Sequence, residues 1–256
     1  TTTKKADAAV SIDNPRELAY ESGSNYLYVS SYTGKVYKID MTTRTIAGES
    51  AVVGANLEGI AVAGNKLYVC NSCSSDYTTY YKNVVELNAS TLAKNQDIEV
   101  VDDPVDVINA GSAIFILSMG IYADKDKPAT VQILKDGQLS TIGNATMMAY
   151  DAYNDQLYMI NAPFGGDKEY KVYNLKNGQT TTFLTNPDIF SPYSLAVNPV
   201  NGDVFITSST KNPDTGYADY TADCKLYRYT SAGILLGTYD CGVNPGTIVC
   251  DSYYQK

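Results

Sequence analysis

Short apolar runs alternate with polar turns along the whole chain, and no stretch keeps a helical period over three turns. One unit recurs: an apolar strand, a turn with Gly or Asn, a second strand with an aromatic residue among aliphatic ones, an alternating third strand and a polar fourth strand. Alternation with a period of two is typical of half-buried β-strands. The pattern therefore predicts antiparallel hairpins. The aromatic residues of the second strands are Tyr28, Tyr68, Phe115, Tyr158 and Phe205.

The five aromatic positions are separated by 40, 47, 43 and 47 residues, by subtraction of their numbers. That period fits a propeller blade of roughly 40–50 residues built from four strands. We therefore predict an all-β chain that forms a β-propeller of four-stranded antiparallel blades, as a single domain over residues 1–256. The five complete blades are expected at about residues 14–56, 57–103, 104–144, 145–190 and 191–243.

Both ends of the chain hold single strands in this pattern. Residues 1–13 are expected to be an outer strand, and Gly246–Cys250 is a sixth copy of the inner strand. Propellers usually close by pairing strands from the two termini, which protects both edges. Because the middle pair of strands is missing here, we expect that one or two N-terminal blades of a seven-bladed parent are absent. The alternative is a complete five- or six-bladed protein with a degenerate last blade.

Composition narrows the possible functions. The formal net charge is −9, and a negative field repels nucleic acid, so we expect no nucleic-acid partner. The absence of histidine removes Ser-His-Asp and Cys-His nucleophiles and imidazole-ligated metals, so we expect neither an enzyme nor a cofactor. No run approaches the roughly 18 apolar residues of a membrane helix, and no membrane-spanning segment is expected.

Long loops fall almost entirely between the second and third strands, at about residues 72–82, 119–129, 162–168 and 210–224. These loops share one face with the segments that lead into each blade, and function concentrates on loops that a rigid scaffold holds. Tyr is abundant there, and its amphipathic ring suits recognition. The predicted ligand-binding residues on this face are Arg16, Tyr32, Tyr77, Tyr80, Tyr81, Asp106, Tyr122, Phe164, Tyr193, Tyr217 and Tyr220.

A structural role is the alternative for each of these residues. A loop Tyr can pack down on a blade edge, and Arg16 and Asp106 can bind neighbouring blades instead of facing the mouth of the central channel. The function expected from the loops is binding of a small molecule. The alternative function is a protein–protein interaction scaffold in a cell-surface complex.

The five cysteines cannot all pair within one chain. Cys224 and Cys241 bracket one hairpin at nearly matched positions, which predicts a cross-strand disulfide. Cys70 and Cys73 form a lone C-x-x-C, and a zinc site would need a second pair, so a local disulfide or two thiols is the simpler interpretation. The stretches 124–127 and 212–216 lack the full set of calcium ligands, so no metal site is expected.

Several segments resemble the YncE-like, or YVTN-type, β-propellers. The resemblance rests on Pro15-Arg16-Glu17-Leu18-Ala19, Leu27-Tyr28-Val29-Ser30-Ser31-Tyr32, Lys35-Val36-Tyr37-Lys38-Ile39-Asp40, Glu58-Gly59-Ile60-Ala61-Val62, Asn65-Lys66-Leu67-Tyr68-Val69 and residues 194–203. It covers essentially the whole chain and is closest to the surface-lipoprotein branch of Gram-negative gut bacteria.

That resemblance implies an extracytoplasmic protein, at the cell surface or in the periplasm, with an export signal and lipid anchor upstream. Members of this branch capture cobalamin and related corrinoids and deliver them to an outer-membrane transporter. It therefore implies a corrinoid or other small molecule as ligand and such a transporter as partner. No residue motif marks the corrinoid binders, so the ligand-binding residues above rest on loop position alone.

Overall fold

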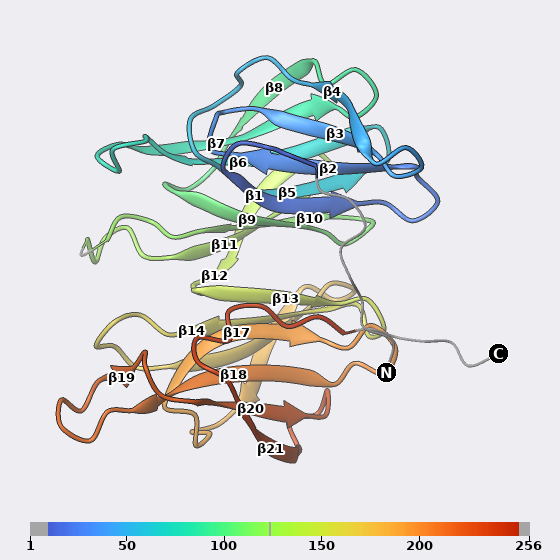
Figure 1. The fold of residues 1–256 in the computed structure, drawn as a ribbon. Helices are drawn as coiled ribbons and strands as arrows, with labels where there is room; N and C mark the ends of the chain where they lie inside the picture. The colour runs from blue at the N-terminus through green and yellow to red at the C-terminus, as the bar shows by residue number, and fades with distance from the viewer. Residues whose placement is uncertain (1–9, 123, 251–256) are drawn as a thin grey trace. The chain divides into compact units, whose positions relative to one another are not determined.

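The computed structural model describes residues 10–122 and 124–250. Within these ranges the regular structure consists of β-strands, and no helix is long and apolar enough to cross a membrane (Figure 1). The strands form five antiparallel sheets, each in one of the ranges predicted for the blades. They divide into two compact units, residues 1–141 and 142–256, which we describe in turn.

The first unit contains three four-stranded sheets, and in each of them strands that are consecutive in the chain lie side by side. The first sheet consists of β1 (Pro15–Tyr20), β2 (Tyr26–Ser31), β3 (Val36–Asp40) and β4 (Thr45–Glu49). The second consists of β5 (Leu57–Ala63), β6 (Lys66–Cys73), β7 (Tyr80–Asn88) and β8 (Lys94–Glu99). The third consists of β9 (Pro104–Asn109), β10 (Ile114–Ser118), β11 (Thr130–Lys135) and β12 (Gln138–Gly143).

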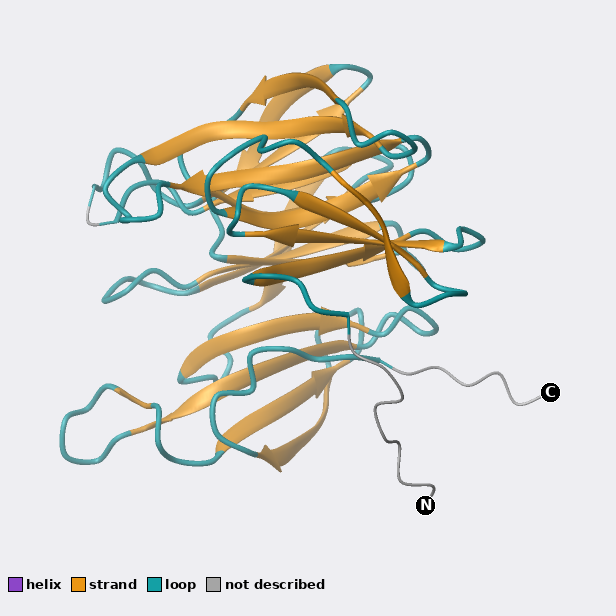
Figure 2. Cartoon of the chain, turned by 45° about the horizontal axis from the view of Figure 1, so that its top comes forward, coloured by secondary structure: helices purple, strands orange, loops and turns teal. Residues whose placement is uncertain are grey.

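The second unit contains two sheets with the same order. One consists of β13 (Met147–Asp151), β14 (Gln156–Asn161), β15 (Glu169–Asn174) and β16 (Gln179–Leu184). The other consists of β17 (Ser191–Val197), β18 (Val204–Lys211), β20 (Cys224–Tyr229) and β21 (Leu235–Cys241). A short strand that the sequence does not predict, β19 (Ala218–Asp219), pairs with the end of β18. Strands and connecting loops alternate along the described chain (Figure 2).

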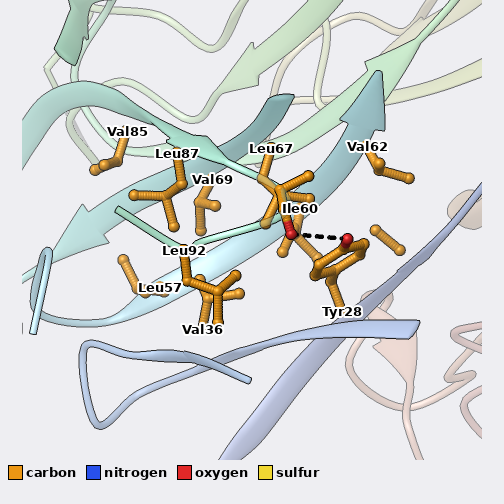
Figure 3. Packing of buried hydrophobic residues seen from close by; sticks show 12 residues of the cluster. Tyr28, Val36, Leu57, Ile60, Val62, Leu67, Val69, Val85, Leu87 and Leu92 are labelled. Carbon is orange, nitrogen blue, oxygen red and sulfur yellow. Dashed lines mark hydrogen bonds between the residues drawn. The ribbon is translucent and has the colours of Figure 1, made fainter. Parts of the chain in front are cut away.

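Apolar residues are buried between neighbouring sheets rather than in one central core. One cluster joins the first two sheets and includes Tyr28, Val36, Leu57 and Leu87 (Figure 3). Similar clusters join the second sheet to the third and, in the second unit, the fourth to the fifth. Contact is closest between the first strands, since a Cβ atom on Gly59 of β5 would lie 2.7 Å from the Asp106 Cα of β9.

The recurring aromatic residue occupies the same register in every sheet. It pairs with Ala on the first strand in four of the five sheets, as Tyr28 does with Ala19 and Tyr158 with Ala149. Four of the five aromatic side chains are buried, and Phe205 is partly exposed beneath the Arg228 guanidinium, which lies 5.8 Å from the ring centroid. The small Ala leaves room for the large ring of its register partner. Because this pair recurs in successive blades, the aromatic residue recurs at about the length of one blade.

Three segments differ from the sequence prediction or lie partly outside the described residues. The prediction of an inner strand at Gly246–Cys250 is wrong, because this segment forms no strand and pairs with none in the described structure. Tyr80 and Tyr81 lie on β7 rather than in a loop, because β6 and β7 extend further than their apolar pattern. The predicted outer strand at residues 1–13 lies mostly outside the described residues, and 10–13 form no strand.

Candidate functional site

Each sheet has a long-loop end, which we define as the end that carries the connection between its second and third strands. The antiparallel order puts this connection at the same end as the segment that leads into the first strand. The long connections there are residues 74–79 and 119–129 in the first unit, and 162–168 and 212–223 in the second. The opposite end carries the turns after the first and third strands.

Arg16, at the start of β1, binds the neighbouring sheet. Its Nε and Nη2 atoms donate hydrogen bonds to Glu58 of β5 at 3.0 and 3.2 Å, and its guanidinium lies 4.4 Å from the ring centroid of Tyr32. The Tyr32 hydroxyl also donates to Glu58, and the hydrogen bond with Glu58 raises the pKa of Arg16. The structural alternative is thus realised for Arg16, although a large part of its side chain remains exposed.

Asp106 lies further along the inner strand β9 and is half-buried. Burial raises the pKa of Asp106 to about 6, and the charge of Glu17 on β1 contributes to the rise. Among the described residues, no salt bridge or side-chain hydrogen bond joins Asp106 to Arg16. Asp103, at the segment that leads into β9, accepts a 2.5 Å hydrogen bond from Ser72 and so ties the second sheet to the third.

The predicted Tyr residues of the first unit do not form one cluster. Tyr77 and Tyr122 are exposed on separate loops, with relative accessibilities of 60% and 79%. Tyr80 and Tyr81 are half-buried on β7. Tyr77 is near enough to Arg16 and Tyr32 to raise the pKa of both groups slightly, so these three residues share one region at the long-loop end.

In the second unit, two predicted aromatic residues stack on each other. Phe164, from the β14–β15 loop, and Tyr217, from the loop after β18, have ring centroids 6.3 Å apart and an interplanar angle of 16°. Both rings remain largely exposed, at 84% and 66%. Large aromatic rings are usually covered because their exposure is unfavourable. An exposed stacked pair therefore offers a flat apolar surface to a ligand.

Two lysines from the segments that carry this pair lie over a third aromatic ring, that of Phe190, and none of these three residues was predicted from the sequence. Phe190 precedes β17, and the ammonium groups of Lys168 and Lys211 lie 5.8 and 6.0 Å from its ring centroid. Lys168 belongs to the loop of Phe164, and Lys211 to the hairpin of Tyr217. Within the described part of the chain, neither lysine has a carboxylate at ion-pair distance. We call Phe164, Lys168, Phe190, Lys211 and Tyr217 the aromatic–lysine cluster.

Tyr193 and Tyr220 lie beside the segment that follows β21. Asn244 donates a 3.2 Å hydrogen bond to the carbonyl of Tyr220, and a Cβ atom on Gly246 would lie 3.5 Å from the Tyr193 ring. The carbonyl of Pro245 accepts hydrogen bonds from Ser194 and Thr207 at 2.9 and 3.0 Å. These two Tyr residues thus border a segment held over the first strands of the fifth sheet.

Cys224 and Cys241 are direct register partners in the β20–β21 hairpin, and both carry free thiols in this structure. Burial raises the pKa of Cys241, and the neighbouring Cys224 raises it further. The disulfide therefore remains a prediction. Cys70 and Cys73 are also free and buried, and the described residues contain no group of His, Cys, Asp and Glu that could hold a metal ion.

No family model and no curated protein sequence matches the chain. It is similar to solved structures of a gluconolactonase from Xanthomonas campestris (17% identity, TM-score 0.56, covering 92% of this chain and 77% of that one) and of TolB from Acinetobacter baumannii (12%, 0.58, 91% and 55%). The WD40 repeats of RRP9 give 12% identity and a TM-score of 0.58, covering 88% of this chain and 66% of that one. This chain has a β-propeller fold. At such identities the similarity establishes the fold alone, and the sheets described above are its blades.

Phe164 and Tyr217 were predicted from the sequence, whereas Lys168, Phe190 and Lys211, which complete the candidate site, were not. Lys168 and Lys211 occur in polar loops, where lysine is common, and Phe190 appears as an ordinary residue between two blades. One signal was available, because Phe190 directly precedes an inner strand at the long-loop end. Lys168 and Lys211 meet at the Phe190 ring because of the way the fourth and fifth blades pack, which the sequence pattern does not show.

Proposed function

We propose that this protein is an extracytoplasmic propeller that binds a small molecule at the aromatic–lysine cluster. The observation that carries the proposal is the exposed stack of Phe164 on Tyr217. The two loops that carry the stack begin or end at lysines that lie over Phe190 and have no carboxylate partner among the described residues. Binding sites combine apolar surface with a few polar groups that fix orientation. The cluster has both elements.

The cluster favours a flat ligand that carries a negative group. The stacked rings supply aromatic area with little loss of conformational entropy on binding. Lys168 and Lys211 attract an anionic substituent against the −9 net charge of the chain. Complete corrinoids such as cobalamin combine a broad ring system with a phosphate group, so the resemblance to YncE-like surface propellers and the chemistry of the cluster agree on this class. Delivery to an outer-membrane transporter belongs to the same proposal.

Binding without catalysis is part of the proposal. The chain has no histidine, and the cluster holds aromatic rings and lysines but no carboxylate or thiol nucleophile. A protein–protein scaffold is the second candidate, and the exposure of Tyr77 and Tyr122 on separate loops of the first unit favours it. A protein partner would contact such dispersed residues, whereas a small ligand would contact only the cluster.

The test is a thermal-shift screen with cobalamin, cobinamide, planar aromatic carboxylates and oligosaccharides, followed by calorimetry on variants. Phe164→Ala and Tyr217→Ala should each weaken binding by about 1–3 kcal/mol, the loss usual for anchoring aromatic residues. Lys168→Gln and Lys211→Gln should weaken anionic ligands and leave neutral ones unchanged. The matched control is Tyr153→Ala, since Tyr153 is 65% exposed at the opposite end of the same unit.

Two results would overturn the proposal. One is a ligand from the screen whose affinity is the same in all four cluster variants. The other is an equal loss of affinity in Tyr153→Ala, which would mean that the variants act through general surface properties. If Tyr77→Ala and Tyr122→Ala abolish capture of a purified protein partner and the cluster variants do not, the scaffold function replaces the small-molecule function.

A further inference from the structure

A cavity of about 430 Å³ lies between the second and third blades, at the end opposite the long loops. It opens among the turns β5–β6, β9–β10 and β11–β12, so it is separate from the proposed site. Its volume falls within the range of small-molecule sites, roughly 300–1,000 Å³. Apolar and polar residues line it, among them Lys66, Tyr68, Glu86, Asp97, Leu134 and Leu139.

The equivalent space between the first and second blades is filled. There the Tyr28 hydroxyl donates a 2.9 Å hydrogen bond to the carbonyl of Ala89 (Figure 3). Lys38, the register partner of Tyr28 on β3, directs its ammonium to the carbonyls of Ala89 and Ser90 at 3.3 and 3.2 Å. In the second unit, Tyr158 likewise donates to the carbonyl of Ser231 at 3.2 Å.

Two changes in sequence leave the second interface open. The register partner of Tyr68 is Glu86, whose carboxylate cannot donate to carbonyl groups of the next blade as the Lys38 ammonium does. The turn that would meet Tyr68 is also shorter: Asp136 and Gly137 alone join β11 to β12, whereas five residues, 89–93, join β7 to β8. The third blade therefore does not reach the Tyr68 hydroxyl.

Tyr68 is the clearest sign that the cavity is a site. Its side chain is buried, with 7% of its surface exposed, and the residue lines the cavity. Among the residues that the structure describes, none makes a hydrogen bond with its hydroxyl. The hydroxyl is not among the fully buried, unpartnered polar atoms of the described chain, so it reaches the cavity, where solvent or a ligand can satisfy it.

The charges around the cavity favour a cation. Burial acts to raise the pKa of Glu86, but hydrogen bonds from Lys66, Asn95 and Gln96 outweigh it and lower that pKa, so the carboxylate stays ionised. Asp97 and Asp136 add two carboxylates, and the Lys66 ammonium is the one cation among the lining residues. Asp97 is already paired with Lys94, at 2.7 Å, so Glu86 and Asp136 are the carboxylates nearest to being available to a ligand. The apolar side chains of Ile98, Leu134 and Leu139 form part of the lining, where a non-polar group can pack.

We propose that this cavity binds a small organic amine with an apolar body. The ammonium group takes the place that Lys38 fills in the preceding interface, near Glu86 and the Tyr68 hydroxyl. The apolar body packs on Ile98, Leu134 and Leu139. This site is independent of the aromatic–lysine cluster, which lies in the other unit and favours anions.

The test compares cyclohexylamine with cyclohexanol, which has a similar ring and no charge, by NMR titration of the ¹⁵N-labelled chain. The amine should shift amide signals of residues 111–114 and 134–139 saturably, and cyclohexanol should bind at least about threefold more weakly. Tyr68→Phe should weaken amine binding about three- to tenfold through loss of one hydrogen bond. Lys66→Gln should strengthen it, because the competing ammonium is removed.

Tyr28→Phe is the matched control, since it removes the equivalent hydroxyl from an interface without the cavity and should leave amine binding unchanged. It should lower stability, whereas Tyr68→Phe should not, because the Tyr68 hydroxyl has no bond to lose. The proposal is overturned if no saturable shifts occur at these residues, if cyclohexanol binds as well as the amine, or if Tyr68→Phe and Tyr28→Phe change binding equally.

Discussion

Asp106 carries a charge that the fold disfavours at neutral pH. The carboxyl is half-buried on the inner strand β9, where burial and the charge of Glu17 raise its pKa from 3.8 to about 6. The backbone N–H of Val107 offsets only part of this. Asp106 therefore binds a proton more tightly in the folded protein than in the unfolded chain. Such a group makes the folded protein lose stability as pH rises from about 3.8 to about 6. Such groups often belong to functional sites, because structure alone gives no reason to keep them.

We therefore predict that Asp106→Asn stabilises the protein above pH 6.5 and has no effect near pH 4. The difference between the pKa values of the folded and unfolded states corresponds to at most about 3 kcal/mol in the free energy of unfolding. Partial exposure of the carboxyl reduces this gain to about 1–2 kcal/mol. Urea unfolding of both proteins at pH 4 and pH 7.5 measures the change in the free energy of unfolding that Asp106→Asn causes. Asp126→Asn, at an exposed loop position, is the control and should stay within about 0.5 kcal/mol at both pH values. Equal effects of Asp106→Asn at both pH values would contradict the assignment.

Of the five residues of the aromatic–lysine cluster, Phe164 and Tyr217 were predicted from the sequence, and Lys168, Phe190 and Lys211 were not. The position of Phe164 and Tyr217 at the long-loop end followed from the strand pattern, whereas their stacking did not. Arg16 illustrates the same limit, because its place at the start of an inner strand was correct and its partner Glu58 is set by the packing of two blades. Sequence periodicity fixes which end of a blade a residue occupies, and side-chain partners across blades depend on tertiary packing.

At the scale of strands and hairpins, the sequence predicted nearly all of the structure. An aromatic residue between aliphatic ones lies opposite a small residue of the first strand in four of the five blades, as Tyr68 does opposite Ala61, and this pair marks the register. The failure at Gly246–Cys250 has a physical reason: an inner strand needs a second strand to satisfy its backbone, and the described chain supplies none. An inner-strand motif predicts a strand only where its hairpin partner is present.

The β20–β21 hairpin yields a prediction about its two cysteines. Residues directly opposite each other on antiparallel strands have Cα atoms about 4.5–5.5 Å apart, which lies within the range for disulfides. Cys224 and Cys241 hold such positions, so we expect them to form a bridge under oxidising conditions. The closed loop of about 18 residues should add about 3 kcal/mol of stability. Peptide mapping without reduction, together with melting curves with and without dithiothreitol, measures both effects.

Cys241→Ser should abolish the stabilisation by oxidation, and Cys250→Ser should not, because Cys250 lies outside the hairpin. The raised pKa of Cys241 means that bridge formation by a disulfide reagent should accelerate as pH rises above 8. Five free thiols after incubation with oxidised glutathione at pH 8.5 would rule the bridge out.

For the whole molecule, net charge decides which partners can approach. The chain carries 28 acidic and 19 basic residues, for a formal charge of −9. Lys168 and Lys211 are a small local exception, and most of the other exposed cations, such as Lys35 and Lys225, pair with carboxylates. Affinity for nucleic acid comes from several phosphate contacts that release counterions. Two lysines can therefore hold one anionic group of a small ligand but cannot offset the repulsion of a polyanion.

We accordingly predict that the protein binds neither duplex DNA nor single-stranded RNA in 50 mM salt at concentrations up to about 100 μM. Fluorescence anisotropy with a 30-base-pair duplex and a 20-nucleotide RNA provides the measurement, and Lys168→Gln/Lys211→Gln serves as the matched variant. The physical reason is specific: each phosphate contact contributes about −0.9 to the slope of log affinity against log salt, and Lys168 and Lys211, which lie over one aromatic ring, offer one pair of such contacts. Saturable binding with a slope of about −4 or steeper, unaffected by the double variant, would contradict the prediction and would locate the cationic surface outside the aromatic–lysine cluster. A small anionic ligand that binds in the same buffer and is lost in the double variant would show that the cluster recognises one charge and one ring surface, and that the acidic remainder of the molecule excludes polyanions.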